Sequence, residues 1–176
     1  MAVGVVMGLH AAYEVFVGGT VINLDIILTY LPVSILYILS MAMGYVGLRY
    51  IELSISSPIC NSSGALVAVL AILFDGIAGY SPLALFAVAL VCVGAVGLGV
   101  VEAREDDELR IERQKASNYK YTKSFMALAM PAAYCVLDAA GTFADSRVLE
   151  IISRTVEDYE ASANVAYELT FLAAGI

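Results

Sequence analysis

The sequence predicts an all-α membrane protein, a polytopic bundle of transmembrane helices. Three observations support this: of the 176 residues 61% are hydrophobic, only 15% are charged, and the mean hydropathy is +0.85. An average soluble domain is about 45–50% apolar and about 25% charged. The composition therefore excludes a soluble enzyme and a disordered chain. The net charge of −8 argues against a nucleic-acid partner, because phosphate binding needs clustered basic side chains.

The charges gather in two short segments and leave the rest of the chain apolar. Twelve of the 26 charged residues lie between positions 102 and 123, and seven lie between 145 and 160. Burying a charge in hydrocarbon is expensive, so both segments are expected to face water. The apolar stretches predict six hydrophobic helices, at residues 2–19, 26–48, 54–74, 82–101, 124–144 and 163–176.

The six apolar stretches differ in whether they are long enough to cross a membrane. Crossing the hydrocarbon layer takes about 20 residues. The four central stretches meet this length, the first is marginal, and the last spans only about 21 Å at 1.5 Å per residue. We therefore expect this chain to be part of a longer protein. A signal peptide is the weaker interpretation of the first helix, because it lacks a basic leader and carries His10 and Glu14.

The basic residues predict the orientation. The expected parts are transmembrane helices in 1–101, a charged connector at 102–123, and a second group of helices in 124–176 with an acidic external loop at 145–162. Seven Lys and Arg residues fall on the side of the connector, whereas only Arg147 and Arg154 fall on the other side. The positive-inside rule places the connector in the cytoplasm. A solvated, partly helical connector is the simpler interpretation; a partner-binding role is the alternative.

The helix at 54–74 opens with an unusual polar stretch. Pro58 lies among five serines, Asn61 and Gly64, and a proline removes one helical hydrogen bond. In lipid, an interrupted backbone is tolerated only where neighbouring groups satisfy it, and in transporters such interruptions form substrate sites. Ser57 and Asn61 are therefore candidate substrate-site residues. Alternatively, these small polar residues serve to join helices.

Ionisable residues inside the apolar stretches are the second set of candidates. His10 and Glu14 are one helical turn apart, as are Tyr134 and Asp138, and Glu168 lies in the last stretch. Such residues usually face the bundle interior and mark ion or substrate paths. A desolvated carboxylate holds its proton more tightly, which suits proton coupling. The alternative is a satisfied structural contact, such as a His10–Glu14 pair.

A stripe on the helix at 26–48 supplies the last candidate. Tyr30, Ser34, Tyr37, Met41 and Gly44 recur every three or four residues, so they share one helical face. This face suits the aromatic lining of a cavity for an apolar or aromatic solute, with Tyr37 at its centre. A helix-packing seam is the competing interpretation.

The sequence contains no motif for catalysis or metal binding. Cys60, Cys92 and Cys135 fall in three different hydrophobic stretches without metal-ligand spacing, and His10 is the single histidine. A GxSxG nucleophile elbow and a Walker lysine motif are both missing. We therefore expect neither an enzyme, nor a metal, nor a cofactor.

Part of the chain resembles a known transporter family. The junction from Tyr45 to Pro58 (YVGLRYIELSISSP) resembles the A-L-R-Y-…-S-x-A-x junction of EamA-like carriers in the drug/metabolite transporter superfamily. The run from Ser63 to Phe74, and then 83–101 with its glycines, is similar to the next two helices of that repeat. The resemblance covers residues 26–101.

The resemblance implies a ten-helix carrier of two inverted five-helix repeats that exports metabolites or drugs from a central cavity. The helix at 124–144 would then open the second repeat. Two features depart from the family: Asp75-Gly76 stands where the family has Gly-Glu, and the connector is long. The family orientation also places this connector outside, whereas the basic residues place it inside.

These patterns together predict a secondary transporter, an exporter of small organic solutes with proton coupling, in a bacterial or archaeal plasma membrane. Its expected polar cavity is formed by Glu14, Tyr37, Asn61 and Asp138. The expected partners are a small-molecule substrate, the lipid bilayer and protons, with no nucleic acid; a homodimer is left open. The alternative function is a non-transporting membrane scaffold or sensor.

Overall fold

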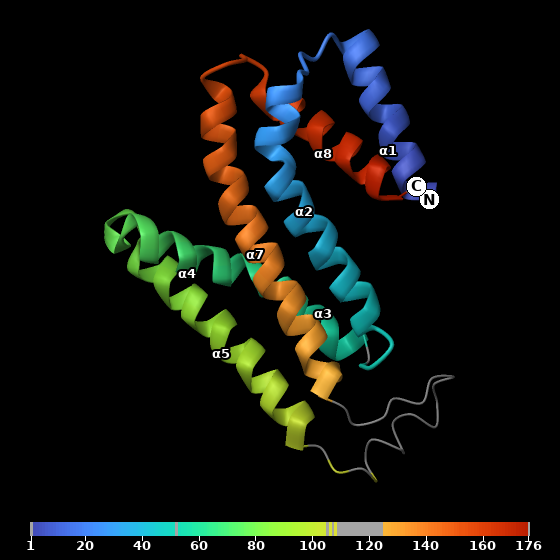
Figure 1. The fold of residues 1–176 in the computed structure, drawn as a ribbon. Helices are drawn as coiled ribbons and strands as arrows, with labels where there is room; N and C mark the ends of the chain where they lie inside the picture. The colour runs from blue at the N-terminus through green and yellow to red at the C-terminus, as the bar shows by residue number, and fades with distance from the viewer. Residues whose placement is uncertain (1, 52, 105, 107, 109–124, 176) are drawn as a thin grey trace. The chain divides into compact units, whose positions relative to one another are not determined.

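The computed structural model describes residues 2–51, 53–104, 106, 108 and 125–175. This part of the chain is helical and holds no strand, which confirms the predicted all-α class (Figure 1). The elements in chain order are α1 (Ala2–Tyr13), the π-helical turn η1 (Glu14–Gly18), α2 (Leu24–Gly47), α3 (Leu53–Asn61), α4 (Ser63–Asp75), the 3₁₀ turn η2 (Ile77–Gly79), α5 (Pro82–Arg104), α7 (Phe125–Ser153) and α8 (Tyr159–Gly175).

Four helical stretches of the described chain are long and apolar enough to cross a membrane. They are Leu24–Gly47, Ser56–Asp75, Pro82–Val101 and Phe125–Ser153. No residue of Pro82–Val101 is buried, and large apolar side chains such as Phe86 and Val93 are 65% and 70% exposed. Exposed apolar surface of this extent is unfavourable in water and favourable in hydrocarbon. The four stretches therefore indicate a membrane-embedded protein.

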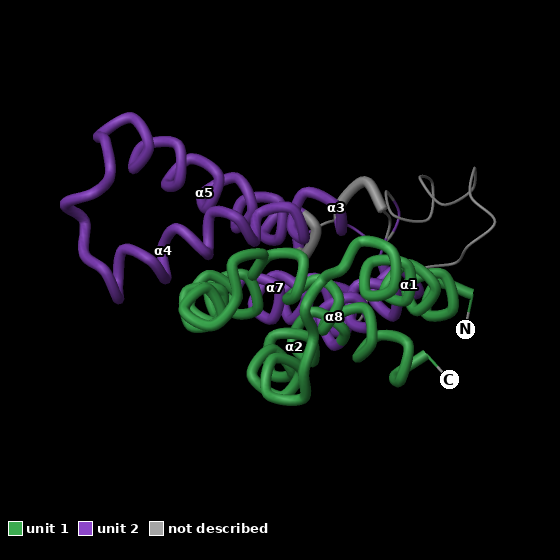
Figure 2. The backbone as a smooth tube through the Cα atoms, turned by 90° about the horizontal axis from the view of Figure 1, so that it is seen from above, with its two compact units in different colours: residues 1–38, 140–176 green, residues 39–139 purple. Residues whose placement is uncertain are grey.

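The chain forms two compact units (Figure 2). Unit 1 comprises residues 1–38 and 140–176, and unit 2 comprises residues 39–139. α2 and α7 each contribute residues to both units. The core of unit 1 consists of Ile26, Tyr30, Val33, Ile152, Ala163 and Ala166. The core of unit 2 is smaller and consists of Ile51, Ile59 and Ala127.

In unit 1, α1 packs closely on α8 because two glycines line the contact. A Cβ atom on Gly4 would lie 3.4 Å from the carbonyl oxygen of Phe171. A Cβ on Gly8 would lie 2.7 Å from Cδ2 of Leu172, so any larger residue would displace that side chain. Small residues allow this close approach, the usual means of packing helices where lipid supplies no hydrophobic drive.

The polar stretch at 54–74 does interrupt the helix, but at Ser62 rather than at Pro58. Pro58 lies inside α3, whereas Ser62 separates α3 from α4. The Ser62 amide bonds to the carbonyl of Ile59, three residues back, at 3.2 Å. The Ser62 hydroxyl donates to the same carbonyl at 2.6 Å. Such local serine bonds compete with the regular helical pattern, which explains the position of the break.

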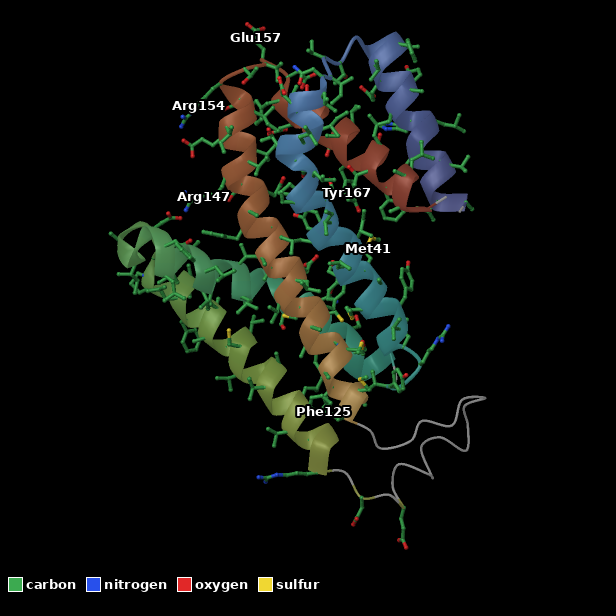
Figure 3. The ribbon with its side chains drawn as sticks, viewed as in Figure 1. Met41, Phe125, Arg147, Arg154, Glu157 and Tyr167 are labelled. Carbon is green, nitrogen blue, oxygen red and sulfur yellow. The ribbon has the colours of Figure 1, made fainter. Side chains whose placement is uncertain are left out.

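The expectation of a loop at 145–162 is wrong. α7 continues to Ser153 and α8 begins at Tyr159, so only residues 154–158 connect them. The cause is amphipathicity: Val148, Leu149 and Ile152 pack in the unit 1 core. Arg147 is exposed on α7, and Arg154 is exposed directly after its end, as Figure 3 shows. High charge density here marks one face of a helix rather than a loop.

The charged connector predicted at 102–123 lies mostly outside the described residues. Its first three residues, 102–104, form the end of α5. The expected helix at 2–19 is present, but its last turn is π-helical from Glu14.

Candidate functional site

A pocket of about 250 Å³ in unit 2 lies beside the interrupted helix. Three helices line it: α2 supplies Met41, Gly44 and Tyr45, with Leu48 directly after its end, α3 supplies Ser56, Ser57 and Cys60, and α7 supplies Tyr134. Met41 is labelled on α2 in Figure 3. We call this the serine–tyrosine pocket. It contains the predicted residues Ser57 and Tyr134.

Side-chain pairs one helical turn apart order the α3 wall of this pocket. Asn61 Nδ2 donates to Ser57 Oγ at 3.1 Å, and Ser56 Oγ lies 3.7 Å from Cys60 Sγ. Ser62, just beyond the wall, lies with its Oγ 3.4 Å from Cys135 Sγ on α7. Because these hydroxyls are fixed by neighbours, the wall presents polar groups in defined positions.

The α2 and α7 walls approach each other closely at two glycines of α2, Gly44 and Gly47. A Cβ atom on Gly44 would lie 2.9 Å from Cδ2 of Tyr134, so the tyrosine ring rests directly on the glycine. A Cβ on Gly47 would lie 3.1 Å from Cβ of Met130. The position of the Tyr134 ring in the pocket thus depends on the absence of a side chain at residue 44.

The lining of the pocket carries no charged side chain. Asp138 lies one turn beyond Tyr134 on α7, half-buried, and does not belong to the lining. Asn61 is exposed and reaches the pocket only through its bond to Ser57. The pocket is thus neutral, with hydroxyl, thiol and aromatic groups.

A second group, in unit 1, joins three predicted residues from distant parts of the chain. His10 Nδ1 lies 2.9 and 3.1 Å from the two carboxylate oxygens of Glu168, and His10 Nε2 lies 3.8 Å from Glu14 Oε1. We call these three residues the histidine–glutamate cluster. The side chain of Glu168 is only 14% exposed, whereas that of His10 is 57% exposed. The tighter partner of His10 is therefore Glu168, not the expected Glu14.

The π-turn positions Glu14 in this cluster. The Glu14 carbonyl accepts from the amides of both Gly19 and Thr20, and Thr20 Oγ1 donates to Glu14 Oε2 at 3.3 Å. Gly19 has φ +75°, a left-handed conformation that favours glycine. π-Helical turns are rare and occur frequently at functional sites.

The carboxylates favour the protonated form of His10. The hydrogen bond to Glu168 and the charge of Glu168 raise the pKa of His10 above its usual 6.5, Glu14 adds a smaller contribution, and desolvation opposes it. Neither α1 nor α8 is among the four candidate spans, so His10 and Glu168 both lie outside them.

Tyr37, the remaining candidate, also lies in unit 1. Its hydroxyl donates to Thr142 Oγ1 at 3.2 Å, and its ring meets Tyr167 edge to face, with centroids 6.0 Å apart. On the same face of α2, about two turns closer to its N-terminus, the Tyr30 hydroxyl donates to Asp145 Oδ1 at 2.6 Å. Within unit 1 the tyrosine stripe is thus a hydrogen-bonded packing seam, whereas Met41 and Gly44 of the same stripe line the pocket of unit 2.

The four residues expected to form one cavity divide between the units. Glu14 and Tyr37 belong to unit 1, whereas Asn61 and Asp138 belong to unit 2, so the common cavity stays a prediction. Sequence reasoning missed Tyr45 and Cys60 as lining residues and Glu168 as the partner of His10. Among the described residues, no group of three or more His, Cys, Asp or Glu side chains suits a metal ion.

Comparison with known proteins gives no identification. No family model, no curated protein and no solved structure matches this chain. The resemblance to EamA-like carriers therefore rests on the quoted motifs alone.

Proposed function

We propose that this chain is a secondary transporter of small organic solutes, an exporter driven by protons. One observation carries the proposal: a pocket bounded by three helices lies beside the interruption of a candidate membrane span. Interrupted helices are the usual places where transporters bind substrate, because freed backbone and hydroxyl groups can face a cavity there. The resemblance to EamA-like carriers, with their ten helices, supports the same function and a plasma-membrane location.

The histidine–glutamate cluster supports the proton part of the proposal. It combines one base with two carboxylates outside the four candidate spans, and a histidine beside carboxylates can take up and release a proton near neutral pH. Asp138, half-buried and next to the pocket wall, is the second proposed proton carrier. Replacing Asp138 by Asn is expected to weaken the pH dependence of transport.

Flux through proteoliposomes tests the proposal. The purified protein is reconstituted and exposed to a panel of small organic solutes, with and without a pH gradient. We expect solute flux, increased by the gradient, that falls about tenfold in Tyr134→Ala, because this substitution removes the α7 side chain that lines the pocket. The matched control is Leu83→Ala, an exposed α5 residue outside the pocket, which should keep its flux. Absence of flux for every solute would contradict the proposal.

The scaffold or sensor alternative makes a different prediction. A transporter should keep its flux when residues 103–118 of the connector are deleted, whereas a scaffold should lose its partner protein. Circular dichroism of each variant confirms that its helices remain formed.

A further inference from the structure

The chemistry of the serine–tyrosine pocket restricts what it can hold. All of its eight lining residues are uncharged. A charged solute would therefore lose water without gaining an opposite charge, and an unpaired charge is costly to bury. The pocket selects against both cations and anions.

Two tyrosine rings and two sulfur atoms dominate the lining. The Cδ2–Cε2 edge of the Tyr134 ring lies against Gly44, and Tyr45, Met41 and Cys60 complete the apolar part. Aromatic rings attract other rings in stacked or edge-to-face arrangements, and methionine sulfur also contacts rings favourably. These groups favour a planar aromatic solute over an aliphatic one.

The polar groups are few and lie together. Ser56 and Ser57 are adjacent on α3, and Ser57 Oγ already accepts from Asn61. A solute with one N–H or O–H at its edge can donate to these hydroxyl oxygens. The volume of about 250 Å³ lies below the range of about 300–1,000 Å³ that drug-sized ligands need, so one or two fused rings fit.

We infer that the serine–tyrosine pocket binds an uncharged aromatic solute of one or two rings that carries a single hydrogen-bond donor. This inference rests on the proposed function and names the substrate class of the same pocket. It also accounts for Gly44: a larger residue there pushes the Tyr134 ring from its place.

Indole is a suitable probe because the chain has no tryptophan and 11 tyrosines. Energy transfer from protein tyrosines to bound indole then reports binding in lipid nanodiscs, with empty nanodiscs as the control for partition into lipid. We expect saturable indole binding, weaker by about a hundredfold for the cation tryptamine and the anion indole-3-acetate, because no lining residue carries an opposite charge. Equal or tighter binding of either charged analogue would overturn the inference.

Two substitutions locate the indole in the pocket. Gly44→Ala should weaken indole binding about tenfold, because its Cβ displaces the Tyr134 ring. The control Gly64→Ala adds a Cβ that meets no atom within 4 Å and should leave binding unchanged. Ser57→Ala, which removes only an oxygen, should weaken indole binding about fivefold. Unchanged binding in both Gly44→Ala and Ser57→Ala would overturn the inference.

Binding and flux together separate the inference from the proposed function. Saturable indole binding without flux of any solute would contradict the proposed transporter function and support the aromatic binding site. Flux of charged solutes with no indole binding would contradict the inferred substrate class and support the transporter function.

Discussion

Ser34 on α2 is fully buried, and its hydroxyl has no hydrogen-bond partner within the described part of the chain. It lies one turn from Tyr30 and from Tyr37, whose hydroxyls are both bonded to α7. A buried hydroxyl without a partner costs about 1–3 kcal/mol. The stripe therefore contains one member that opposes folding.

Removing this hydroxyl should stabilise the protein. We expect Ser34→Ala to raise the free energy of unfolding by about 1 kcal/mol, because the substitution removes an unpaired polar group and leaves almost no cavity. Ser40 on the same helix is equally buried but has an interaction partner, so Ser40→Ala is the matched control and should lower it. Unfolding in mixed detergent micelles measures both. Equal destabilisation by the two substitutions would contradict this account of Ser34.

At the scale of elements, the contact between α1 and α8 combines close packing with one ion pair. Gly4 and Gly8 bring the helices together, and His10 joins Glu168 across the contact. The charged and titratable groups at this contact are His10 on α1, Glu14 on η1 and Glu168 on α8. The protonation of one imidazole therefore affects how firmly α1 is held.

The sign of the pH effect follows from the pKa of His10. Because its pKa is raised in the folded protein, its stabilising contribution is complete below pH 6.5 and is lost as the pH rises through the folded value. As the only histidine, it gives a single imidazole signal in NMR of labelled protein. We expect its titration midpoint above 6.5, and a fall toward 6.5 in Glu168→Gln.

Glu160→Gln is the control for this titration. Glu160 lies on the same helix but is exposed and is not in contact with His10, so the midpoint should not move. Glu14→Gln should lower the midpoint less than Glu168→Gln, because the oxygen of Glu14 lies 3.8 Å away rather than 2.9 Å. A midpoint insensitive to Glu168→Gln would show that the pair does not form in solution.

The elements also show what the sequence could predict. Composition and charge spacing located the helices, because a long apolar run has few alternatives to a helix in lipid. The sequence does not predict the last turns of α7, because the charged residues around Leu149 and Ile152 favour a loop. Leu149 and Ile152 in fact lie on the buried face of the helix. The pairing of His10 with Glu168 joins residues 158 positions apart. Helical periodicity relates only residues within a few turns, so no local pattern could reveal that contact.

At the scale of the whole molecule, the membrane is what makes the exposed apolar surface acceptable. Val93 lies in the middle of Pro82–Val101 and is 70% exposed. On a soluble protein, a lysine at such an exposed position would change stability by less than about 0.5 kcal/mol. In the centre of a membrane helix, insertion scales assign a lysine a cost of about 2.5–3.5 kcal/mol.

Val93→Lys therefore distinguishes a lipid-facing α5 from a water-facing one. We expect it to reduce the fraction of protein that withstands alkaline extraction from membranes. The charged lysine is unfavourable in hydrocarbon, so α5 must shift to bring it to water or leave the membrane. Glu157→Lys, exposed between α7 and α8 (Figure 3), introduces the same residue at a position already charged and should leave that fraction unchanged. Equal extraction of the two variants would mean that α5 does not lie in lipid. The membrane location on which the transporter proposal depends would then be contradicted.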